Sequence, residues 1–255
     1  MAALERITSA KNPAVRAMRE LKDRRAREAS GHFLVEGEKM ILEARGCGLR
    51  LHRLLLEESL PLPAWAASLP GYAVPRGILE AVCDTRTPQG MCAEFDMPSF
   101  VPLTSAPARI VALDGVQDPG NVGTIWRTAD AAGFQGLLLG AGSADPFSPK
   151  VQRAAMGSGF RVPCMRAEDL SDALRSLSAQ GWRVIASSLR GEDFYSRPDA
   201  GEKFVLVIGN EARGISEAVQ AAADMLVKLP MRGGAESLNA AVAAGIMMYE
   251  LMRGQ

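Results

Sequence analysis

Residues 204–214 read FVLVIGNEARG, and the order of side chains in this stretch decides the fold. Five consecutive apolar residues, Phe204–Ile208, predict a strand that is buried on both faces. Gly209, Asn210 and Glu211 follow at once, so the strand ends in a polar loop. In parallel sheets such loops lie at the carboxyl edge, where ligands bind. The stretch therefore predicts an α/β protein with a binding site at that edge.

From residue 109 onward, short aliphatic runs alternate with helical patterns on both sides of this strand. This alternation predicts a mostly parallel sheet with helices on both faces. The expected strands are Ile110–Leu113, Gly136–Leu139, Val184–Ala186, Phe204–Ile208 and Leu226–Leu229, and the expected helices are Asn121–Ala132, Pro149–Met156, Leu170–Ser178, Ser216–Ala223 and Leu238–Leu251.

The region before residue 108 has a different organisation. Residues 97–107 contain three prolines among serine and threonine, which disfavour a helix or a central strand and indicate a linker. Residues 31–96 alternate strand and helix patterns, as a small α/β domain would. The predicted divisions are a basic helical lead-in (1–30), the small domain (31–96), the linker (97–107) and a larger domain (108–255). The expected elements of the small domain are strands at Phe33–Glu36 and Leu51–Leu56, a helix at Glu38–Ala44, and further runs at Trp65–Leu69, Ala73–Val74, Ile78–Val82 and Met91–Phe95.

The composition predicts a globular protein, with 47% hydrophobic residues, 5% aromatic residues and a formal net charge of zero. None of the four cysteines forms a C-x-x-C pair, which argues against a zinc site or a redox motif. Four cysteines are also few for a disulfide framework in a chain of this size. The longest apolar stretch is too short to span a bilayer, and the N-terminus resembles no signal peptide. We therefore expect a cytoplasmic protein without a membrane segment or a metal.

The lead-in is strongly basic although the whole chain is neutral. Residues 1–27 hold eight Lys or Arg and three acidic residues, a local net charge of +5. Such a run is commonly a solvated helix face, and it is also what an arm that contacts phosphate requires. The charge alone leaves both interpretations open.

Several common site motifs are absent from the sequence. The segment 115–120 has the glycine spacing of a phosphate-binding loop, but Asn121 stands where that loop needs lysine. No G-x-G-x-x-G opens a helix after a strand, which argues against an ordinary dinucleotide or Rossmann-type methyltransferase fold. The histidines, His32 and His52, both lie in the small domain, away from the expected loops. A Ser-His-Asp triad or a histidine metal site in the larger domain is therefore not indicated.

Three polar, glycine-containing segments follow strands of the larger domain. Each alone has a structural explanation, such as a helix cap, a surface ion pair or a turn glycine. Their occurrence at three successive strand ends is harder to explain by structure alone. The segments are Asn121-Val-Gly-Thr-Ile-Trp-Arg127, Gly209-Asn-Glu-Ala-Arg-Gly214 and Leu229-Pro-Met-Arg-Gly-Gly-Ala-Glu-Ser-Leu-Asn239.

Together these segments resemble the three motifs of the SpoU/TrmH-like branch of the SPOUT RNA methyltransferases, over roughly residues 108–252. Ala240 and Ala241 follow the third motif where the family often has Val-Ser, so one hydroxyl is lost. The segment Phe33-Leu-Val-Glu-Gly-Glu38 and the alternation after it resemble, more loosely, the ribosomal-protein-like RNA-binding domain of the same family.

The resemblance implies a deep trefoil knot in a C-terminal parallel-sheet domain, one of the rare exceptions to unknotted chains. It also implies S-adenosylmethionine as cofactor, a homodimer, and Arg127 of one subunit facing the cofactor of the other. The implied cofactor-binding residues are Ser188, Leu189, Gly209, Asn210, Leu229, Met231 and Leu238, and the implied catalytic residues are Arg127, Asn121, Glu211, Ser237 and Asn239. Phosphate contacts are expected from Arg16, Arg24, Arg25, Lys150 and Arg153, with Arg161 a further candidate.

The implied reaction moves a methyl group to a ribose 2′-hydroxyl of RNA, and the N-terminal resemblance favours rRNA over tRNA. A ribose hydroxyl is a weak acid, so the protein must orient it and help remove its proton. Arg127 is either the base or, since a guanidinium stays protonated, a cation that stabilises the developing alkoxide. Glu211 would orient a partner or relay the proton. Two alternatives remain open, a non-catalytic RNA-binding module that retains the fold and an enzyme acting on a small molecule.

Overall fold

The computed structural model describes residues 4–253, and these divide into two compact units. The first unit comprises residues up to Pro98 together with Phe147–Arg153, and the second comprises Ser99–Pro146 and the residues from Ala154 onward. Residues 1–3 of the predicted lead-in and residues 254–255 of the predicted larger domain lie outside the described part. Within residues 4–253, no helix is long and apolar enough to cross a membrane.

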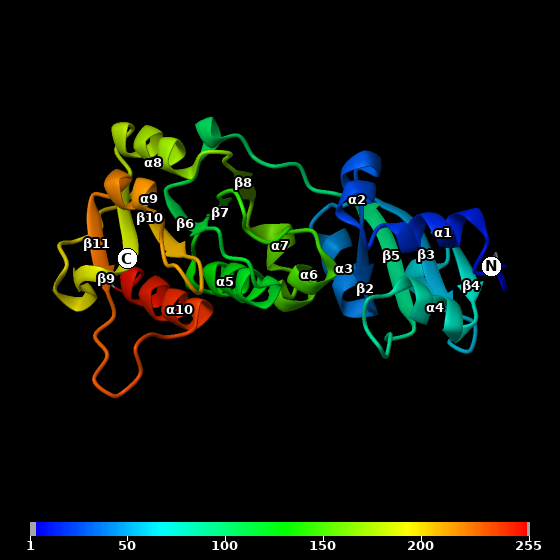
Figure 1. Ribbon diagram of the computed structural model, residues 1–255. Coiled ribbons are helices and arrows are strands. Elements are labelled where there is room, and N and C mark those ends of the chain that lie inside the picture. Colours follow the sequence, from blue (N-terminus) through cyan, green and yellow to red (C-terminus); the bar gives the residue numbers. More distant parts are fainter. Residues whose placement is uncertain (1–3, 254–255) are drawn as a thin grey trace. The chain divides into compact units, whose positions relative to one another are not determined.

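The second unit is built on a six-stranded parallel sheet in the order β11-β9-β10-β6-β7-β8 (Figure 1). This arrangement confirms the α/β class and the parallel sheet expected from the aliphatic runs. The strands are β6 (Arg109–Asp114), β7 (Gly136–Leu139), β8 (Cys164–Arg166), β9 (Arg183–Asp193), β10 (Phe204–Gly209) and β11 (Met225–Lys228).

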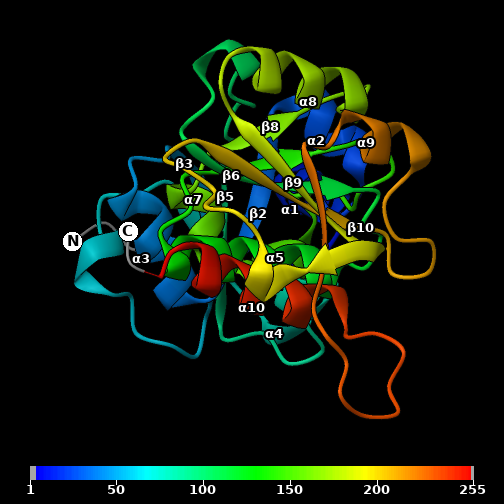
Figure 2. The ribbon, with the colours of Figure 1, turned by 90° about the vertical axis from the view of Figure 1, so that its left-hand side faces the viewer.

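Helices cover both faces of this sheet (Figure 2). On one face, α8 and α9 bury leucine, valine and alanine side chains against β6, β9 and β10. On the other, α5 and α10 pack against each other and α10 against β10. The helices are α5 (Pro119–Ala132), α6 (Pro149–Ala155), α7 (Ser158–Arg161), α8 (Leu170–Ala179), α9 (Glu217–Ala222) and α10 (Ala240–Leu251), with short 3-10 turns η2 (Leu103–Ser105) in the predicted linker and η3 (Phe194–Ser196) after β9.

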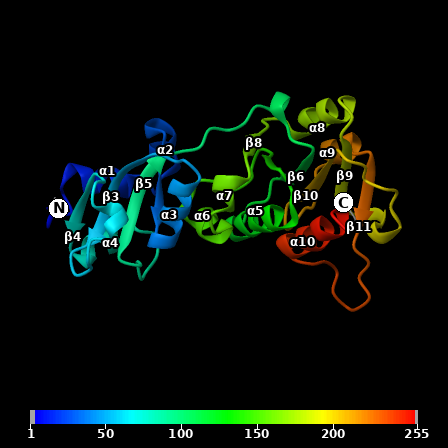
Figure 3. The ribbon, with the colours of Figure 1, turned by 180° about the vertical axis from the view of Figure 1, so that it is seen from behind.

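The first unit has a five-stranded mixed sheet in the order β1-β4-β3-β5-β2 (Figure 3). Helices α1 and α4 bury Val15, Met18 and Leu79 against the face that carries Leu34 and Leu55. The elements are β1 (Glu5–Arg6), α1 (Pro13–Glu20), α2 (Arg24–Ser30), β2 (His32–Glu36), α3 (Glu38–Gly46), β3 (Leu51–Glu57), η1 (Ala64–Ala66), β4 (Gly71–Val74), α4 (Arg76–Val82) and β5 (Met91–Asp96).

Two boundaries differ from the sequence-based division. The lead-in forms the expected helices α1 and α2, but it is part of the first unit, because β1 pairs with β4 and α1 fills the core. The segment Phe147–Arg153 groups with the same unit and not with the larger domain. Its Phe147 ring packs edge-on against Phe33, and Arg153 pairs with Asp84 at 2.7 Å. The hydrophobic pattern of the sequence does not reveal these contacts, because each joins segments that are far apart in the chain.

Candidate functional site

The candidate site lies at the carboxyl edge of the parallel sheet of the second unit. The central strands β6 and β10 are neighbours, although β7, β8 and β9 come between them in the chain. The chain therefore leaves β6 in one direction and returns from the other, which is the switch point where ligands bind in such sheets. The loops after β6 and β10 carry the first and second motifs, and the third follows β11 at the same edge because all the strands are parallel.

Glu211 joins the first two motif loops through its carboxylate. Its Oε1 accepts hydrogen bonds from Asn121 Nδ2 at 3.0 Å and from the backbone of Asp118 at 3.2 Å, and its Oε2 accepts from Gln117 at 3.3 Å. Burial raises the pKa of Glu211, but hydrogen bonds, above all that from Asn121, lower it, so the pKa ends below its usual value. Glu211 is thus an ionised clamp on the loop after β6.

Asn121 extends this clamp to the third motif. Its side chain is buried, and its Oδ1 accepts a hydrogen bond from Asn239 Nδ2 at 2.9 Å. Asn239 in turn caps α10, since its Oδ1 accepts from the backbone of Ala241 and Val242 at 2.9 and 3.2 Å. A chain of hydrogen bonds, Glu211–Asn121–Asn239, therefore connects all three motifs. We call it the motif network.

The loop after β10 is tight enough to require glycine. A Cβ on Gly209 would lie 2.3 Å from the carbonyl carbon of Gly214, closer than real contacts allow. Gly214 itself has a φ of +69°, in the left-handed region that favours glycine. Asn210 closes the loop by donating to the carbonyl of Gly115 at 2.8 Å and accepting from the backbone of Ala212 at 3.0 Å. The second motif is therefore fixed by its own backbone.

Strand β9 departs from the sheet beside this loop. Its register with β11 jumps from Ala186 opposite Leu226 to Glu192 opposite Val227, so residues 187–191 project out of the ladder. The projection contains Ser188 and Leu189, and the Leu189 side chain is 69% exposed. Gly191 permits the return, because a Cβ there would lie 2.4 Å from the backbone nitrogen of Val227.

These features fit the predicted cofactor. Strand β9 lies between β10 and β11, so the residues expected to bind S-adenosylmethionine come from three adjacent strands at one edge. Exposed leucines at positions 189 and 238 offer apolar surface for a flat heterocycle, and the neighbouring loop backbone offers hydrogen-bonding groups. Leu229 is nearly buried at the end of this edge, and Met231 is half-buried.

Arg127 and Ser237 are not part of the motif network. Arg127 is exposed in the third turn of α5, and it makes no hydrogen bond or ion pair within residues 4–253. Ser237 is exposed in the loop before α10. The structure thus brings together Asn121, Glu211 and Asn239 of the predicted catalytic residues and leaves these two side chains directed to solvent.

The residues expected to contact phosphate lie in different settings. Arg25 and Lys150 are exposed, whereas Arg16 and Arg24 form helix ion pairs with Glu20 and Glu28. Surface pairs of this kind are weak and leave the cation available. Two of the six candidates are engaged more closely, Arg153 with Asp84 at 2.7 Å and Arg161 with Asp130 at 2.7 Å.

The two histidines, which the sequence analysis set aside, form a cluster in the first unit. His32 and His52 stack with ring centroids 4.0 Å apart. His32 Nδ1 lies 2.7 Å from Glu94 Oε1, and His52 Nε2 lies 2.5 Å from Asp96 Oδ1. The sequence signal for this cluster is that His32, Glu94 and Asp96 fall at the paired ends of two expected strands.

Comparison with known proteins agrees with this geometry. Residues 108–249 match the model of the SpoU rRNA Methylase family. Residues 12–93 match a second model, the MRM3-like substrate binding domain. The two matches fall on either side of the predicted linker.

Relatives match over nearly the whole chain. The 23S rRNA (guanosine(2553)-2′-O)-methyltransferase RlmP of Bacillus subtilis is 35% identical over 97% of this chain and 99% of its own length. The AdoMet-bound rRNA methyltransferase from Sinorhizobium meliloti has a TM-score of 0.88 at 34% identity, covering 98% of this chain and 97% of that one. The AdoMet complex of the SpoU methyltransferase AviRb from Streptomyces viridochromogenes has a TM-score of 0.86 at 30% identity, with 95% and 98% covered. The chain therefore belongs to the SpoU rRNA methylase family of RNA methyltransferases.

Proposed function

We propose that this protein transfers a methyl group from S-adenosylmethionine to a ribose 2′-hydroxyl of ribosomal RNA in the cytoplasm. The observation that carries the proposal is the motif network, which ties the loops after β6 and β10 to the start of α10. The Bacillus relative is named for 2′-O-methylation of a guanosine in 23S rRNA, and the Sinorhizobium structure is of an AdoMet-bound rRNA methyltransferase. Both are similar to this chain over nearly its full length.

The cofactor supplies an electrophilic methyl group on a sulfonium, a good leaving group. Ser188, Leu189, Gly209, Asn210, Leu229, Met231 and Leu238 are proposed to hold it. Gly209 and Asn210 contribute a rigid loop, because the backbone of the second motif is fixed by its glycines and by the Asn210 side chain.

Arg127 is proposed to act on the RNA. An exposed guanidinium without a partner among the described residues is available to hold a phosphate and to stabilise the developing alkoxide oxygen. A protonated guanidinium is a poor base, so the hydroxyl proton is proposed to pass to solvent water, which reaches the exposed Arg127. Glu211 is ionised but accepts three hydrogen bonds from the loop after β6 and the start of α5, so we assign it and Asn121 to positioning. Asn239 is proposed to hold the third loop through the motif network, and the exposed Ser237 to contact the substrate.

The working form is proposed to be a homodimer in which Arg127 faces the cofactor of the partner subunit. The support is an exposed apolar stripe on α10. Val242, Ile246 and Tyr249 recur at helical spacing and are 51, 38 and 57% exposed. Side chains of this kind on one helix face mark an interaction surface. We also propose that the second unit contains the deep trefoil knot implied by the family resemblance.

The RNA contacts are proposed to come from the basic residues of the first unit, chiefly Arg16, Arg24, Arg25 and Lys150, with a smaller contribution from Arg153. Affinity for RNA should then fall steeply with added salt. DNA lacks the 2′-hydroxyl and should not be methylated.

The test is transfer of tritium from labelled S-adenosylmethionine to total RNA from cells that lack this protein, followed by nucleoside analysis. We expect label on a 2′-O-methylnucleoside in the rRNA size fraction. Label on a base, or in tRNA alone, would overturn the proposal. Binding of the cofactor without any transfer, to RNA or to ribosome-assembly intermediates, would favour the non-catalytic alternative.

A further inference from the structure

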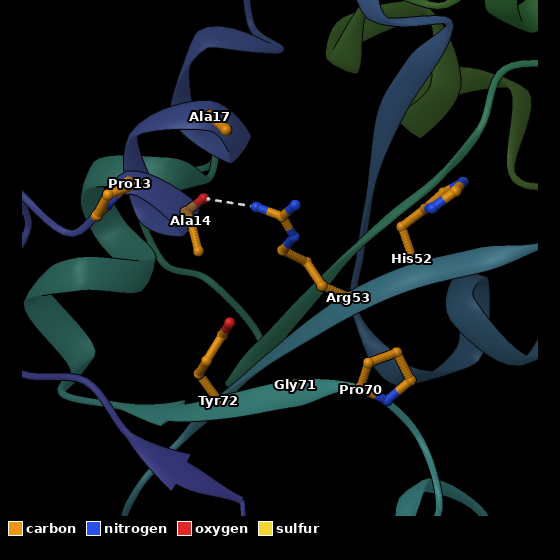
Figure 4. A pocket seen from close by; sticks show the side chains of 8 residues that line it. All are labelled: Pro13, Ala14, Ala17, His52, Arg53, Pro70, Gly71 and Tyr72. Carbon is orange, nitrogen blue, oxygen red and sulfur yellow. Dashed lines mark hydrogen bonds between the residues drawn. The ribbon is translucent and has the colours of Figure 1, made fainter.

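A cavity of about 450 Å³ opens between α1 and the strands β3 and β4 of the first unit (Figure 4). We call it the α1–β3 pocket. Its volume is within the range of small-molecule sites. Its helix side carries only small side chains, and its strand side carries three chemically distinct groups, an imidazole, a guanidinium and a phenol. These residues are Pro13, Ala14 and Ala17 on α1, with His52, Arg53 and Tyr72 on the strands.

A β-bulge places two neighbouring side chains on this pocket. Successive residues of a regular strand point to opposite faces, so His52 and Arg53 would normally diverge. Here Leu51 pairs with Phe95 and Arg53 pairs with Glu94, which leaves His52 as an extra residue without a partner on β5. Bulges of this kind redirect a side chain and are common beside functional sites.

Carboxylates behind the pocket hold both of these side chains in place. The buried Glu94 lies 2.9 Å from Arg53 Nε through its Oε2, and Asp96 accepts from His52 Nε2. Arg53 Nη1 also donates to the carbonyl of Ala14 at 3.3 Å. His52 Nδ1 and Arg53 Nη2 then remain without a hydrogen bond among the described residues. The pocket is therefore preorganised and keeps polar groups for a ligand.

The cluster of His32, His52 and Asp96 beside the pocket is poorly arranged to bind a metal ion. Donor atoms of His32, His52 and Asp96 lie within 4.8 Å of one another. However, the two imidazoles are stacked, with 26° between their planes, so the in-plane lone pairs of their ring nitrogens lie in two nearly parallel planes and are poorly placed to converge on one ion. The carboxylates instead serve to orient the histidines.

We infer that the α1–β3 pocket binds an unpaired nucleobase of the RNA substrate, an inference that rests on the proposed function. Stacking of a base on an aromatic side chain, with hydrogen bonds to its edge, is how proteins read single-stranded RNA. Tyr72 extends from β4 toward α1 and has no hydrogen bond to its hydroxyl among the described residues (Figure 4). Arg53 and His52 can bond the edge of the base or the adjoining phosphate.

Three further observations favour a nucleotide over another ligand. No lining residue is acidic, and Arg53, although it pairs with the buried Glu94, keeps its Nη2 without a hydrogen bond among the described residues for a phosphate or a base edge. The segment that matches a substrate-binding model, residues 12–93, includes every residue of the pocket. Arg16, one of the basic residues proposed to contact phosphate, lies on the same helix as the small side chains of the pocket.

The first test fills the pocket without altering its polar groups. Ala17 is exposed on α1, so Ala17→Met should leave the fold intact while it occupies the space of the base. With unmodified rRNA as probe, we expect the KM for RNA to rise about 10-fold, at unchanged kcat and unchanged cofactor affinity. Ala218→Met, at an exposed position on α9, is the matched control and should behave as wild type.

The second test removes the aromatic surface. Tyr72→Ala should raise the KM for rRNA by a similar factor, whereas Tyr72→Phe keeps the ring and should retain most of the affinity. Unchanged KM values in both Ala17→Met and Tyr72→Ala, in a wild-type protein that methylates rRNA, would overturn the inference. An equal rise of the KM for rRNA in Tyr72→Ala and Tyr72→Phe would also contradict stacking of a base on the Tyr72 ring.

A binding measurement separates this inference from the proposed function. UMP, CMP, AMP and GMP are titrated into the ¹⁵N-labelled full chain, and the amides of Ala17, Gly71 and Tyr72 are followed. Weak, saturable shifts that Ala17→Met abolishes would support a base site even if no methyl transfer were found. Absence of shifts, together with rRNA binding that Ala17→Met leaves unchanged, would refute it. Tight binding of a free nucleotide with unchanged rRNA binding would assign the pocket to a metabolite instead.

Discussion

The motif network of the second unit and the α1–β3 pocket of the first are both held by hydrogen bonds, but they are built differently. In the motif network one carboxylate accepts from an amide side chain and from backbone groups, and Arg127, proposed to act on the RNA, lies outside it. In the pocket, carboxylates hold from behind the side chains that would meet the ligand. The first arrangement fixes loops and leaves the exposed Arg127 outside the network, whereas the second fixes the side chains that line the pocket.

The largest expected effect is that of Arg127→Ala, which tests whether the proposed catalytic side chain acts independently of the motif network. Loss of Arg127 should lower turnover by about 100-fold or more, because the developing alkoxide would lose its stabilising charge. Since Arg127 makes no contact with the network, cofactor affinity and stability should stay nearly unchanged. Turnover is measured by methyl transfer to rRNA and cofactor affinity by calorimetry. Arg175→Ala, at an exposed position on α8, controls for loss of a surface cation. Near-wild-type turnover in Arg127→Ala would remove the catalytic assignment.

Gly209→Ala tests whether the loop after β10 is as rigid as its packing indicates. The added Cβ would collide with the backbone of Gly214, so the loop must shift, at a cost of about 1–3 kcal/mol in the free energy of unfolding. Gly233→Ala is the matched control, since a Cβ there meets nothing within 4 Å, and it should change stability by less than about 0.5 kcal/mol. Denaturant unfolding measures the free energy of unfolding of both variants. Equal values would show that the loop accommodates the added Cβ without cost.

The smallest expected effect concerns the charge of Glu211. Its pKa is lowered in the folded protein, so its stabilising contribution is present above the unfolded pKa of about 4.3 and is lost as the pH falls through the folded value. Wild type should therefore lose more stability than Glu211→Gln between pH 7 and pH 3. The group is partly solvated, so the difference should be about 1 kcal/mol or less. Parallel acid-unfolding curves would mean that the ionised form is not favoured by folding.

The two regions also differ in how far the sequence predicts them. The parallel strands and motif loops of the second unit follow from aliphatic runs and the residues after them, because that information is local. Even there, β8 is only three residues long and was not expected, and β9 extends seven residues beyond the predicted end. Its extension depends on pairing with β11.

The α1–β3 pocket was not predicted, since it depends on partners distant in sequence. His52 gains its position from a register shift against β5, and its carboxylate partner lies 44 residues away. The two-residue strand β1 is equally invisible, because it exists only through its pairing with β4. Apolar periodicity reports which face of an element is buried, but it does not report the register between strands.

Helix α10 connects the two parts of the proposed mechanism, cofactor binding and association of two copies. Its first turn is capped by Asn239, which bonds the motif network, and its outer face carries the exposed apolar stripe. If two copies associate through this stripe as proposed, association and cofactor binding act on the same helix. The two events then share one coupling free energy, so if association orders the third motif loop, cofactor binding favours association by the same factor. Cofactor affinity should accordingly increase with protein concentration across the range in which the dimer forms.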